Sequence, residues 1–387
     1  MMYNFDKLVE RRNTGSLKVD LIRREGLPED TLPLWVADMD FETVPEVKEA
    51  LKKAADHGIY GYTIQKDTYF GAMRNWFLHR FGWEVKQEWA IQTPGVVFAL
   101  AAAVRAYTQE GEGVLIQRPV YHPFSRVIEA NGRIVVNNPL VYEEGRYQID
   151  FADFEEKIIR NHVKLFLLCN PHNPVGRVWK EEELRRMGEI CFKHGVFVVA
   201  DEIHCDFIRK GFSHRNFASL GEAFANNCMV CTAPSKTFNL AGLQISNIFI
   251  PNQDRRRQMQ EELERVSCQE PGLFGLAACE AAYRYGEPWL EELLAYLEGN
   301  LEHIRSYLKE KLPKITLVEP EGTYLLWMNV SSYGYSQEQV SDRLRNHARI
   351  WVNDGAWFGP EGEGFLRLNM ASPRSVIAAA MERLLEF

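Results

Sequence analysis

The residues that could do chemistry follow short apolar runs of the sequence. Lys236 stands in TAPSKTFNLAGLQ (residues 232–244), a lone ammonium among small side chains in an otherwise apolar segment. Asp201 follows the apolar run VFVVA, and an unpaired carboxylate at the mouth of a buried strand would be costly, so it needs a cationic partner. Asn173 lies in NPHNPVG, a turn too rich in Pro and Asn to be a helix or a strand.

An anion site is expected at residues 93–111. This stretch opens with Pro-Gly and runs into an apolar helix, and the N-terminus of such a helix binds anions through its backbone amides. One ligand that meets every group must offer an anion to Gly95 and Val96, a cation to Asp201 and an electrophile to Lys236. Pyridoxal 5′-phosphate has a phosphate, a protonated ring nitrogen and an aldehyde, and a lysine forms a Schiff base with that aldehyde.

Metal and redox chemistry are the alternatives for these segments. Asp201 and His204 could ligate a metal ion, but the sequence shows only these two ligands. Cys228 and Cys231 have the spacing of redox and zinc motifs, yet they lie in an apolar run that predicts a strand, which would place the two thiols on opposite faces. No second C-x-x-C pair and no H-E-x-x-H motif accompanies them, so we expect no metal.

Buried strands are predicted to position these groups. Strand, helix and strand in sequence predict a mostly parallel sheet covered on both sides, whose ligands gather outside the carboxyl ends of the strands. A helix over residues 180–195 is expected to stop at Gly195, which follows His194 as a C-cap. Five short apolar runs have the pattern of strands buried on both faces: residues 113–119, 164–170, 196–202, 228–233 and 243–251.

The end of the chain predicts a second, smaller α/β lobe. Its expected elements are strands over residues 323–330, 349–355 and 365–371 and a helix over residues 336–348. Ser372 and Pro373 predict the N-cap and the first turn of a final helix.

Length and composition favour a small molecule as the partner. With 387 residues, 46% hydrophobic and 25% charged, the chain resembles a globular protein large enough to divide into domains. The net charge of −8 argues against nucleic acid and anionic membranes. The first residues have no apolar signal core, no long apolar run follows, and the seven scattered cysteines fit reduced thiols, so we expect a cytoplasmic protein.

Four motifs, in this order and at these separations, resemble the fold-type I pyridoxal-phosphate enzymes of the aminotransferase superfamily: NPHNPVG, ADEIHCDF, SKTFNLAGLQ and FLRLNMASPR. Together with LPLWVADMDFETVPEV and HGIYGYT, they are similar to the branch of MalY/PatB-type cystathionine β-lyases. The resemblance covers essentially the whole chain. It implies an α/β fold: a large domain (46–285) with a mostly parallel, seven-stranded sheet between helices, a smaller α/β C-terminal domain (286–387), and an N-terminal segment (1–45) that packs with the small domain.

The resemblance also implies roles around the cofactor ring. Lys236 would form the Schiff base and later move the Cα proton, and Asp201 would pair with the pyridine nitrogen. Asn173 would hydrogen-bond the phenolic oxygen of the ring. Tyr121 would stack on the ring face, although it could instead be an ordinary core residue.

Further roles concern the phosphate and the substrate. Gly95, Val96 and Ser235 would hold the phosphate, joined by Tyr62 from the second subunit of a homodimer with a shared site. Arg367 would clamp the substrate α-carboxylate in a bidentate fork, a geometry that lysine cannot supply. The alternatives are mere interface packing for Tyr62 and a surface ion pair for Arg367.

Three positions depart from the wider superfamily. Gln244 stands eight residues after Lys236, where aminotransferases commonly carry an arginine that grips the phosphate, and Ala233 replaces a frequent Ser or Gly. His204 stands where many relatives have a tyrosine that hydrogen-bonds the ring oxygen, and we expect it to contact the cofactor. One fewer positive charge at the phosphate argues against an ordinary transaminase.

The reaction expected from the resemblance is β-elimination from a sulfur amino acid. Cystathionine or another cysteine S-conjugate would give a thiol, pyruvate and ammonia. An aminotransferase is the alternative, because the same residues serve both reactions, and a regulatory protein-binding role, alone or beside catalysis, is a third possibility. The group on the sulfur is not defined by the sequence, although the aromatic residues Trp35, Tyr60, Tyr324 and Trp357 could shape its pocket.

Overall fold

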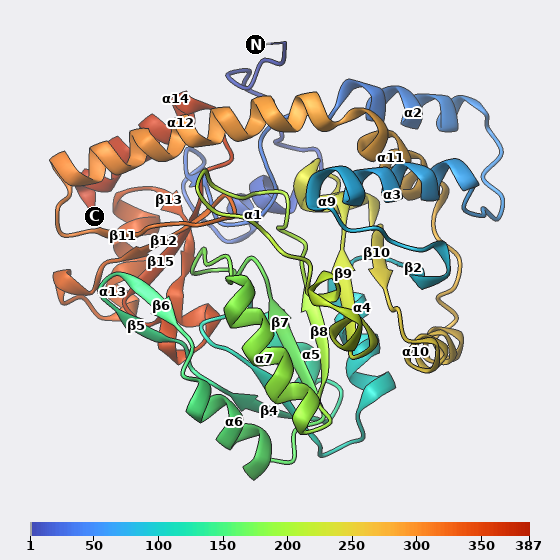
Figure 1. The fold of residues 1–387 in the computed structure, drawn as a ribbon. Coiled ribbons are helices and arrows are strands. Elements are labelled where there is room, and N and C mark those ends of the chain that lie inside the picture. Colours follow the sequence, from blue (N-terminus) through green and yellow to red (C-terminus); the bar gives the residue numbers. More distant parts are fainter. Residues whose placement is uncertain (1) are drawn as a thin grey trace.

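The centre of the molecule is a seven-stranded sheet (Figure 1), found in a computed structural model that describes residues 2–387. The strands lie in the order β2-β10-β9-β8-β7-β3-β4, and β10 is antiparallel to both of its neighbours, whereas the other pairs are parallel. All five predicted runs form strands of this sheet, so the mostly parallel sheet is confirmed. The bounds are β2 (Ala90–Thr93), β3 (Gly113–Ile116), β4 (Ile134–Asn137), β7 (Leu165–Cys169), β8 (Phe197–Asp201), β9 (Cys228–Thr232) and β10 (Ser246–Phe249).

The two edge strands and the direction of β10 were not predicted from the sequence. β2 (AIQT) contains polar residues and β4 (IVVN) has an apolar run of only three residues, and both strands are only partly buried, so neither has the longer buried run typical of a central strand. The sequence of β10 resembles that of its parallel neighbours, because burial on both faces selects the same residues whichever way a strand runs.

Helices cover both faces of the sheet and form two separate hydrophobic cores. Along β7, Leu165 and Leu167 face one core, while Phe166 and Leu168 face the other. One face is covered by α4 (Val96–Tyr107), α5 (Pro123–Glu129) and α10 (Gln253–Arg265). The other is covered by α3 (Asp67–Phe81), α6 (Phe151–Arg160), α7 (Glu181–Lys193), α8 (Glu222–Asn226) and α11 (Leu273–Tyr285), with α2 (Pro45–Asp56) packed on α11.

The same alternation separates the two cysteines of the C-x-x-C sequence. Cys228 belongs to one core and Cys231 to the other, and both thiols are fully buried in β9. The prediction that they face opposite sides of the sheet is confirmed. Within residues 2–387, no group of three His, Cys, Asp or Glu side chains is arranged to hold a metal ion.

A second sheet of four antiparallel strands forms near the C-terminus, in the order β11-β12-β15-β14. The elements are β11 (Thr316–Val318), β12 (Leu325–Asn329), β14 (Asn353–Asp354) and β15 (Phe365–Asn369), with helices α12 (Glu287–Lys311), α13 (Gln337–Asp342) and α14 (Arg374–Arg383). Figure 1 shows α12 running from α2 and α11 to this second sheet. A separate hairpin joins β5 (Val141–Glu143) to β6 (Arg146–Gln148).

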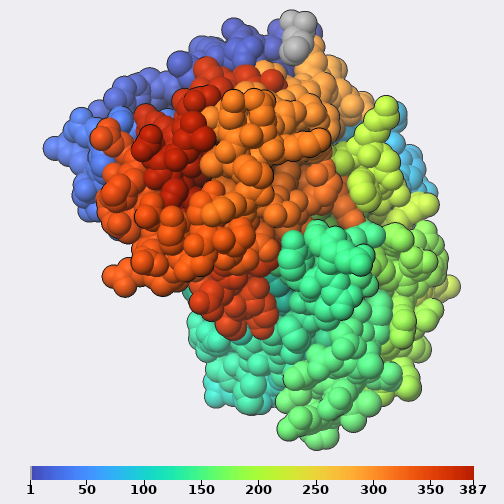
Figure 2. All heavy atoms as spheres, turned by 90° about the vertical axis from the view of Figure 1, so that its left-hand side faces the viewer, coloured from blue at the N-terminus to red at the C-terminus, as the bar shows by residue number. Residues whose placement is uncertain are grey.

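The N-terminal segment lies against the C-terminal part of the chain. After α1 (Leu17–Arg24), strand β1 (Leu32–Pro33) pairs in parallel with β13 (Ile350–Trp351). In Figure 2 the blue N-terminal residues border the orange and red C-terminal residues. This pairing supports the predicted packing of residues 1–45 with the small domain. We propose the predicted division of the chain into residues 1–45, 46–285 and 286–387.

The structure corrects two details of the predicted helices. Pro373, not Ser372, occupies the N-cap of α14, because the Ser372 hydroxyl donates its hydrogen bond to the Asp40 carboxylate instead. The helix expected over residues 336–348 is α13, which continues as a π-helical turn over Arg343–His347. Gly195 does end α7 in a left-handed conformation, as predicted. Among residues 2–387, no helix combines the length and the apolar character needed to cross a bilayer.

Candidate active site

A pocket of about 250 Å³ lies at the carboxyl ends of the parallel strands β7, β8 and β9. Loops that leave neighbouring parallel strands at this edge bring together side chains that are distant in sequence. Arg367 contacts the pocket residue Asn173, whereas Tyr62 lies elsewhere. Eight of the ten predicted site residues line the pocket: Gly95, Val96, Tyr121, Asn173, Asp201, His204, Ser235 and Lys236.

Lys236 lies on the short helix α9 (Pro234–Thr237), directly after β9. Its amino group donates a hydrogen bond of 2.6 Å to the backbone carbonyl of Ala37. Burial lowers the pKa of Lys236 to about 8, an effect that Asp38 and Asp201 oppose and Arg367 reinforces. The side chain is half-buried and its remaining surface faces the pocket. At pH 7 about a tenth of this amine is therefore unprotonated, far more than for an ordinary lysine, and this fraction can act as a nucleophile or a base.

Asp201 is a buried carboxylate that lacks a close cationic partner among residues 2–387. It ends β8, is 5% exposed, and accepts a hydrogen bond of 3.1 Å from the Ile203 amide. Burial raises the pKa of Asp201 to about 7, which the Ile203 hydrogen bond and the charge of Lys236 only partly offset. The cation that the sequence led us to expect is thus not supplied by residues 2–387, and a cationic group of a ligand would complete the site.

Arg367 is a buried guanidinium whose hydrogen bonds go only to neutral groups. It lies on β15, is 2% exposed, and donates to Asn173 Oδ1 (3.0 Å), Asn353 Oδ1 (2.6 Å) and the Trp35 carbonyl (2.8 Å). Burial lowers the pKa of Arg367 to about 10, and its Nε has no partner among the described residues. Because it is neither at the surface nor ion-paired within the described chain, the alternative of a surface ion pair is wrong, and the site suits an incoming carboxylate.

Asn173 links the guanidinium to the pocket. Its Oδ1 accepts from Arg367, so its Nδ2 is the group left to donate into the pocket. The backbone carbonyl of Asn173 accepts from the Tyr121 amide at 3.0 Å, which joins the loops after β3 and β7.

Tyr121 and His204 are two ring side chains that line the pocket. The Tyr121 ring packs edge-on against Trp357 at a centroid distance of 5.9 Å, and burial raises the pKa of its phenol. His204 is buried, and burial together with the charges of Lys236 and Arg367 holds the pKa of its imidazole well below the usual value. The Nδ1 atom of this neutral ring has no partner among residues 2–387.

The anion end of the pocket differs in one respect from the prediction. Gly95 adopts a φ of +102° before α4, and its amide donates to the Thr93 carbonyl at 2.8 Å. The Gly95 amide is therefore already engaged, because the tight turn into the helix folds it back on Thr93. The first turn of α4 still leaves backbone N–H groups without intrahelical partners, including that of Val96. Ser235 and Gln244 complete this end.

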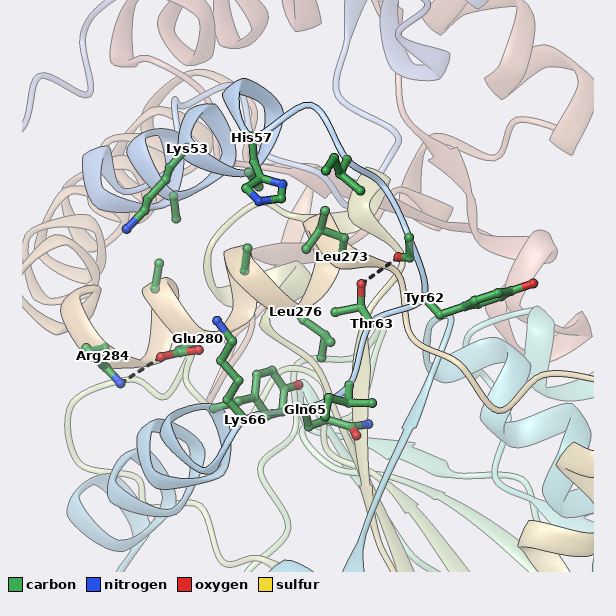
Figure 3. A pocket seen from close by; sticks show the side chains of 18 of the residues that line it. Lys53, His57, Tyr62, Thr63, Gln65, Lys66, Leu273, Leu276, Glu280 and Arg284 are labelled. Carbon is green, nitrogen blue, oxygen red and sulfur yellow. Dashed lines mark hydrogen bonds and ion pairs between the residues drawn. The ribbon is translucent and has the colours of Figure 1, made fainter.

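Tyr62 is a predicted site residue that does not lie at the Lys236 pocket of its own chain. It is 94% exposed and borders a different, larger groove of about 600 Å³ between α2, α11 and the 57–66 loop. Figure 3 shows its side chain extending away from the other labelled residues of that groove.

Ala37 is the site residue that sequence reasoning missed. It lines the pocket, and its carbonyl is the acceptor for Lys236. The role of a backbone carbonyl cannot be predicted from the residue type, because every residue has such a carbonyl. The one available signal was the surrounding stretch VADMD, in which Asp38 and Asp40 interrupt an apolar context.

The fold and the pocket together define the class of fold-type I pyridoxal-phosphate enzymes. Lys236 follows a central strand, and the buried groups of Asp201 and Arg367 have no ionic partner among residues 2–387, so they suit a cationic and an anionic group of a ligand. Residues 29–384 match the family model of aminotransferases of class I and II, and the chain belongs to this family. The family and the fold predicted from the sequence are confirmed.

Individual relatives refine this assignment. The chain is 43% identical over 381 residues to cystathionine beta-lyase PatB of Bacillus subtilis, an alignment that covers 98% of both proteins. A PLP-bound putative aminotransferase from Clostridium difficile superimposes with a TM-score of 0.96 at 41% identity, over 99% of both chains. Cystalysin from Treponema denticola, whose crystal structure contains pyridoxal 5′-phosphate, gives a TM-score of 0.96 at 37% identity, over 100% of this chain and 98% of that one.

Proposed function

We propose that the protein is a pyridoxal-phosphate-dependent carbon–sulfur β-lyase. Its substrate would be L-cystathionine or a related cysteine S-conjugate, cleaved to a thiol (homocysteine from cystathionine), pyruvate and ammonia. The observation that carries the proposal is one pocket in which Lys236, with a lowered pKa, is joined by two buried groups that find no ionic partner among residues 2–387: the Asp201 carboxylate, and the Arg367 guanidinium that contacts the pocket through Asn173. The likeness to a cystathionine β-lyase over the whole chain supports the choice of reaction.

The residues present fit the cofactor. Pyridoxal phosphate, when bound, supplies an aldehyde that condenses with amino groups and a cationic ring that withdraws electrons from the substrate Cα. As a carboxylate, Asp201 would accept a hydrogen bond from the protonated ring nitrogen and keep that nitrogen cationic, which gives the buried carboxylate its missing partner. Asn173 Nδ2 would donate to the ring oxygen, and His204 would offer its neutral imidazole. Val96 and Ser235 would hold the phosphate at the start of α4 and α9.

Substrate binding would rest on Arg367. Its buried fork would take the α-carboxylate in two parallel hydrogen bonds, one of which would replace a hydrogen bond that Nη2 now donates to Trp35 or Asn353. The Phe358 ring packs against this fork, with its centroid 4.8 Å from the guanidinium carbon. Asn173 and Asn353 already fix the plane of the fork, so the Cα–H bond of the substrate would be oriented toward Lys236. Tyr121 and Trp357 would cover the pocket and limit the entry of water.

Lys236 would then move the protons. A pKa of about 8 lets its amine accept the Cα proton near neutral pH, and the resulting ammonium can return that proton to the departing sulfur. Protonation of the sulfur as the Cβ–S bond breaks lets it leave as a neutral thiol, which is a better leaving group than a thiolate. Delivery of the same proton to a carbon of the cofactor would instead produce transamination, so aminotransferase activity is the alternative outcome.

The active site would be completed by a second copy of the chain. Tyr62 lies on an exposed loop with Ile59, Tyr60 and Ile64, each at least 61% exposed, next to the 600 Å³ groove. An apolar strip of this size is typical of a protein interface. A homodimer would cover it and carry Tyr62 to the phosphate of the neighbouring site.

The predicted cytoplasmic location also remains a proposal. All seven cysteines lie within the described residues, and none forms a disulfide. Unpaired thiols fit a reducing compartment.

The test uses purified protein saturated with pyridoxal phosphate. With L-cystathionine, a lyase releases pyruvate and free thiol without any added acceptor, whereas an aminotransferase forms a keto acid only when an acceptor keto acid is present. Lys236→Ala should abolish the reaction, and Lys309→Ala, a change at an exposed position of α12, should not. Absence of thiol and pyruvate from the cofactor-loaded wild type would refute the proposed reaction.

A further inference from the structure

The 34–41 segment is held in place through its backbone carbonyls. Side chains from three parts of the chain donate hydrogen bonds to it: earlier residues of the N-terminal segment, Asn239 shortly after Lys236, and strand β15. The donors and acceptors are Arg367 to Trp35, Asn369 to both Val36 and Asp38, Lys18 to Asp38, Arg11 and Asn239 to Met39, and Asn239 to Phe41. The carbonyls of Val36 and Asp38, on either side of Ala37, are both held by Asn369. The Ala37 carbonyl between them faces the pocket, where it accepts from Lys236.

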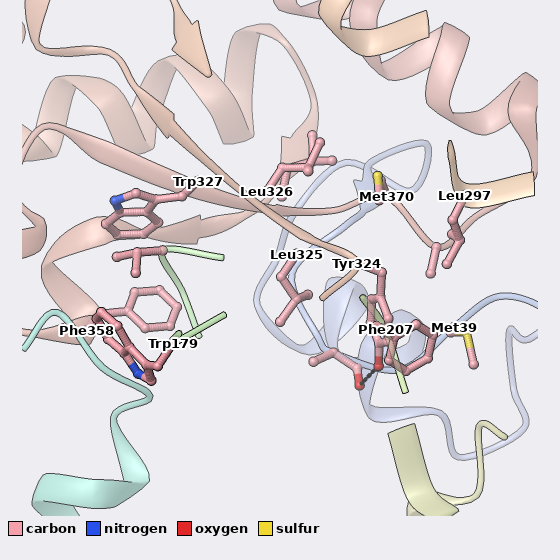
Figure 4. Close-up of a cluster of buried hydrophobic side chains, with 14 of the residues drawn as sticks. Met39, Trp179, Phe207, Leu297, Tyr324, Leu325, Leu326, Trp327, Phe358 and Met370 are labelled. Carbon is pink, nitrogen blue, oxygen red and sulfur yellow. Dashed lines mark hydrogen bonds between the residues drawn. The ribbon is translucent and has the colours of Figure 1, made fainter. Parts of the chain in front are cut away.

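The Ala37 carbonyl accepts two hydrogen bonds. One comes from the Lys236 amine at 2.6 Å and the other from the Tyr324 hydroxyl at 3.0 Å. Tyr324 is fully buried, and burial raises the pKa of its phenol far above the usual value, so the hydroxyl remains a donor. Its ring packs edge-on against Phe207 with a centroid distance of 4.8 Å (Figure 4). It also packs edge-on against His204, at 5.8 Å. The two donors therefore share one acceptor at the pocket wall.

Lys236 cannot stay on this acceptor throughout the proposed reaction. Its nitrogen is bonded to the cofactor before the substrate arrives and is a free amine once the substrate has displaced it. When Lys236 leaves, Ala37 is only 8% exposed and its neighbours are pinned, so its carbonyl has no route to another donor within the described chain. The Tyr324 hydroxyl is then the one group that keeps this carbonyl hydrogen-bonded.

We propose that Tyr324 is a positioning residue that sets the balance between cofactor-bonded and free Lys236. Its hydroxyl satisfies the Ala37 carbonyl in the state where Lys236 is bonded to the cofactor, and the same carbonyl receives the amine when it is released. Loss of the hydroxyl leaves a buried acceptor unsatisfied in the bonded state only, since free Lys236 satisfies it in the other. The proposal rests on the proposed function, because it requires Lys236 to bond the cofactor.

The expected signature is a pair of opposite shifts in Tyr324→Phe. An unsatisfied buried acceptor corresponds to a change of about 5- to 100-fold in an equilibrium constant. Binding of pyridoxal phosphate to the apoprotein, in which Lys236 goes from free to bonded, should weaken by that factor. Displacement of Lys236 by glycine, which has no group to expel, should occur at glycine concentrations lower by the same factor, because Lys236 goes from bonded to free.

Both equilibria are measured from the absorbance of the cofactor, in the wild type, in Tyr324→Phe and in a control, Tyr147→Phe. Tyr147 is a buried tyrosine outside the pocket whose hydroxyl accepts from Trp327, so its removal should shift neither equilibrium. A purely structural role would weaken both affinities together, and that result, or no shift in either, would overturn the proposal. So would a Tyr324→Phe apoprotein that does not fold, since free Lys236 should satisfy Ala37 there.

The outcomes also separate this inference from the proposed function. A wild-type protein that binds no pyridoxal phosphate would contradict both the proposed function and the role of Tyr324. A wild type that binds pyridoxal phosphate and glycine, and cleaves L-cystathionine, but whose Tyr324→Phe variant lacks the opposite shifts would end only the role of Tyr324.

Discussion

Replacing Lys236 by methionine should remove a pH-dependent penalty on the stability of the apoprotein. The pKa of Lys236 falls from an ordinary 10.5 to about 8 in the folded chain, chiefly through burial. Between these two pH values the unfolded chain holds a proton that the folded chain has lost. Stability rises with pH wherever the unfolded state binds more protons, so the wild type gains stability as pH rises through this window. Methionine has a similar length and no proton to lose.

The magnitude follows from the two pKa values. Below pH 8 the penalty approaches the full shift, about 3.3 kcal/mol at pH 7, and it falls to about 1.4 kcal/mol at pH 9.5. The free energy of unfolding of Lys236→Met should therefore exceed that of the wild type by an amount that narrows by about 2 kcal/mol between pH 7 and pH 9.5. A constant offset, from the lost hydrogen bond to Ala37, does not affect this narrowing.

Urea unfolding of the two apoproteins at pH 7, 8, 9 and 9.5 measures the difference, at one protein concentration so that any dimerisation contributes equally. The exposed substitution Lys309→Met is the control and should leave a difference independent of pH. If the gap between Lys236→Met and the wild type stays constant over this range, Lys236 has an ordinary pKa and cannot supply a neutral amine near pH 7.

Three further predictions concern the substrate, the subunit contact and the domain contact. Arg367→Lys should raise the KM for L-cystathionine by about 10- to 100-fold, with a smaller effect on kcat, because a point charge replaces a planar fork; equal KM values would remove Arg367 from substrate binding. Tyr62→Phe should weaken pyridoxal-phosphate affinity by about 2- to 10-fold, and unchanged affinity in a binding titration would count against a shared site. Glu321→Gln should lower the free energy of unfolding by about 1 to 3 kcal/mol, because it removes one of the two carboxylates that pair with the buried Arg177, 2.9 Å away, while Glu183 remains at 2.8 Å. Glu302→Gln, a control at an exposed position, should change the free energy of unfolding little in the same denaturation assay.

Much of the sheet and of its chemistry could be predicted from local sequence. Continuous apolar runs are required of any strand buried on both faces, so all five central runs were recognisable without knowing their partners. Asp201 and Lys236 directly follow such runs, and the carboxyl ends of parallel strands meet at one edge. Their proximity therefore followed from their positions in the chain.

Only the tertiary structure decided the rest, because it depends on contacts between distant segments. The reversal of β10 and the two edge strands arise from hydrogen bonds to neighbouring strands, which residue type does not encode. Arg367 reaches Asn173 across 194 positions, and its lack of a counter-ion is visible only once both domains are in place. The acceptor for Lys236 is a main-chain oxygen 199 positions away, at Ala37. Every residue has such an oxygen, so its role is fixed by where the fold holds it and not by which side chain it carries.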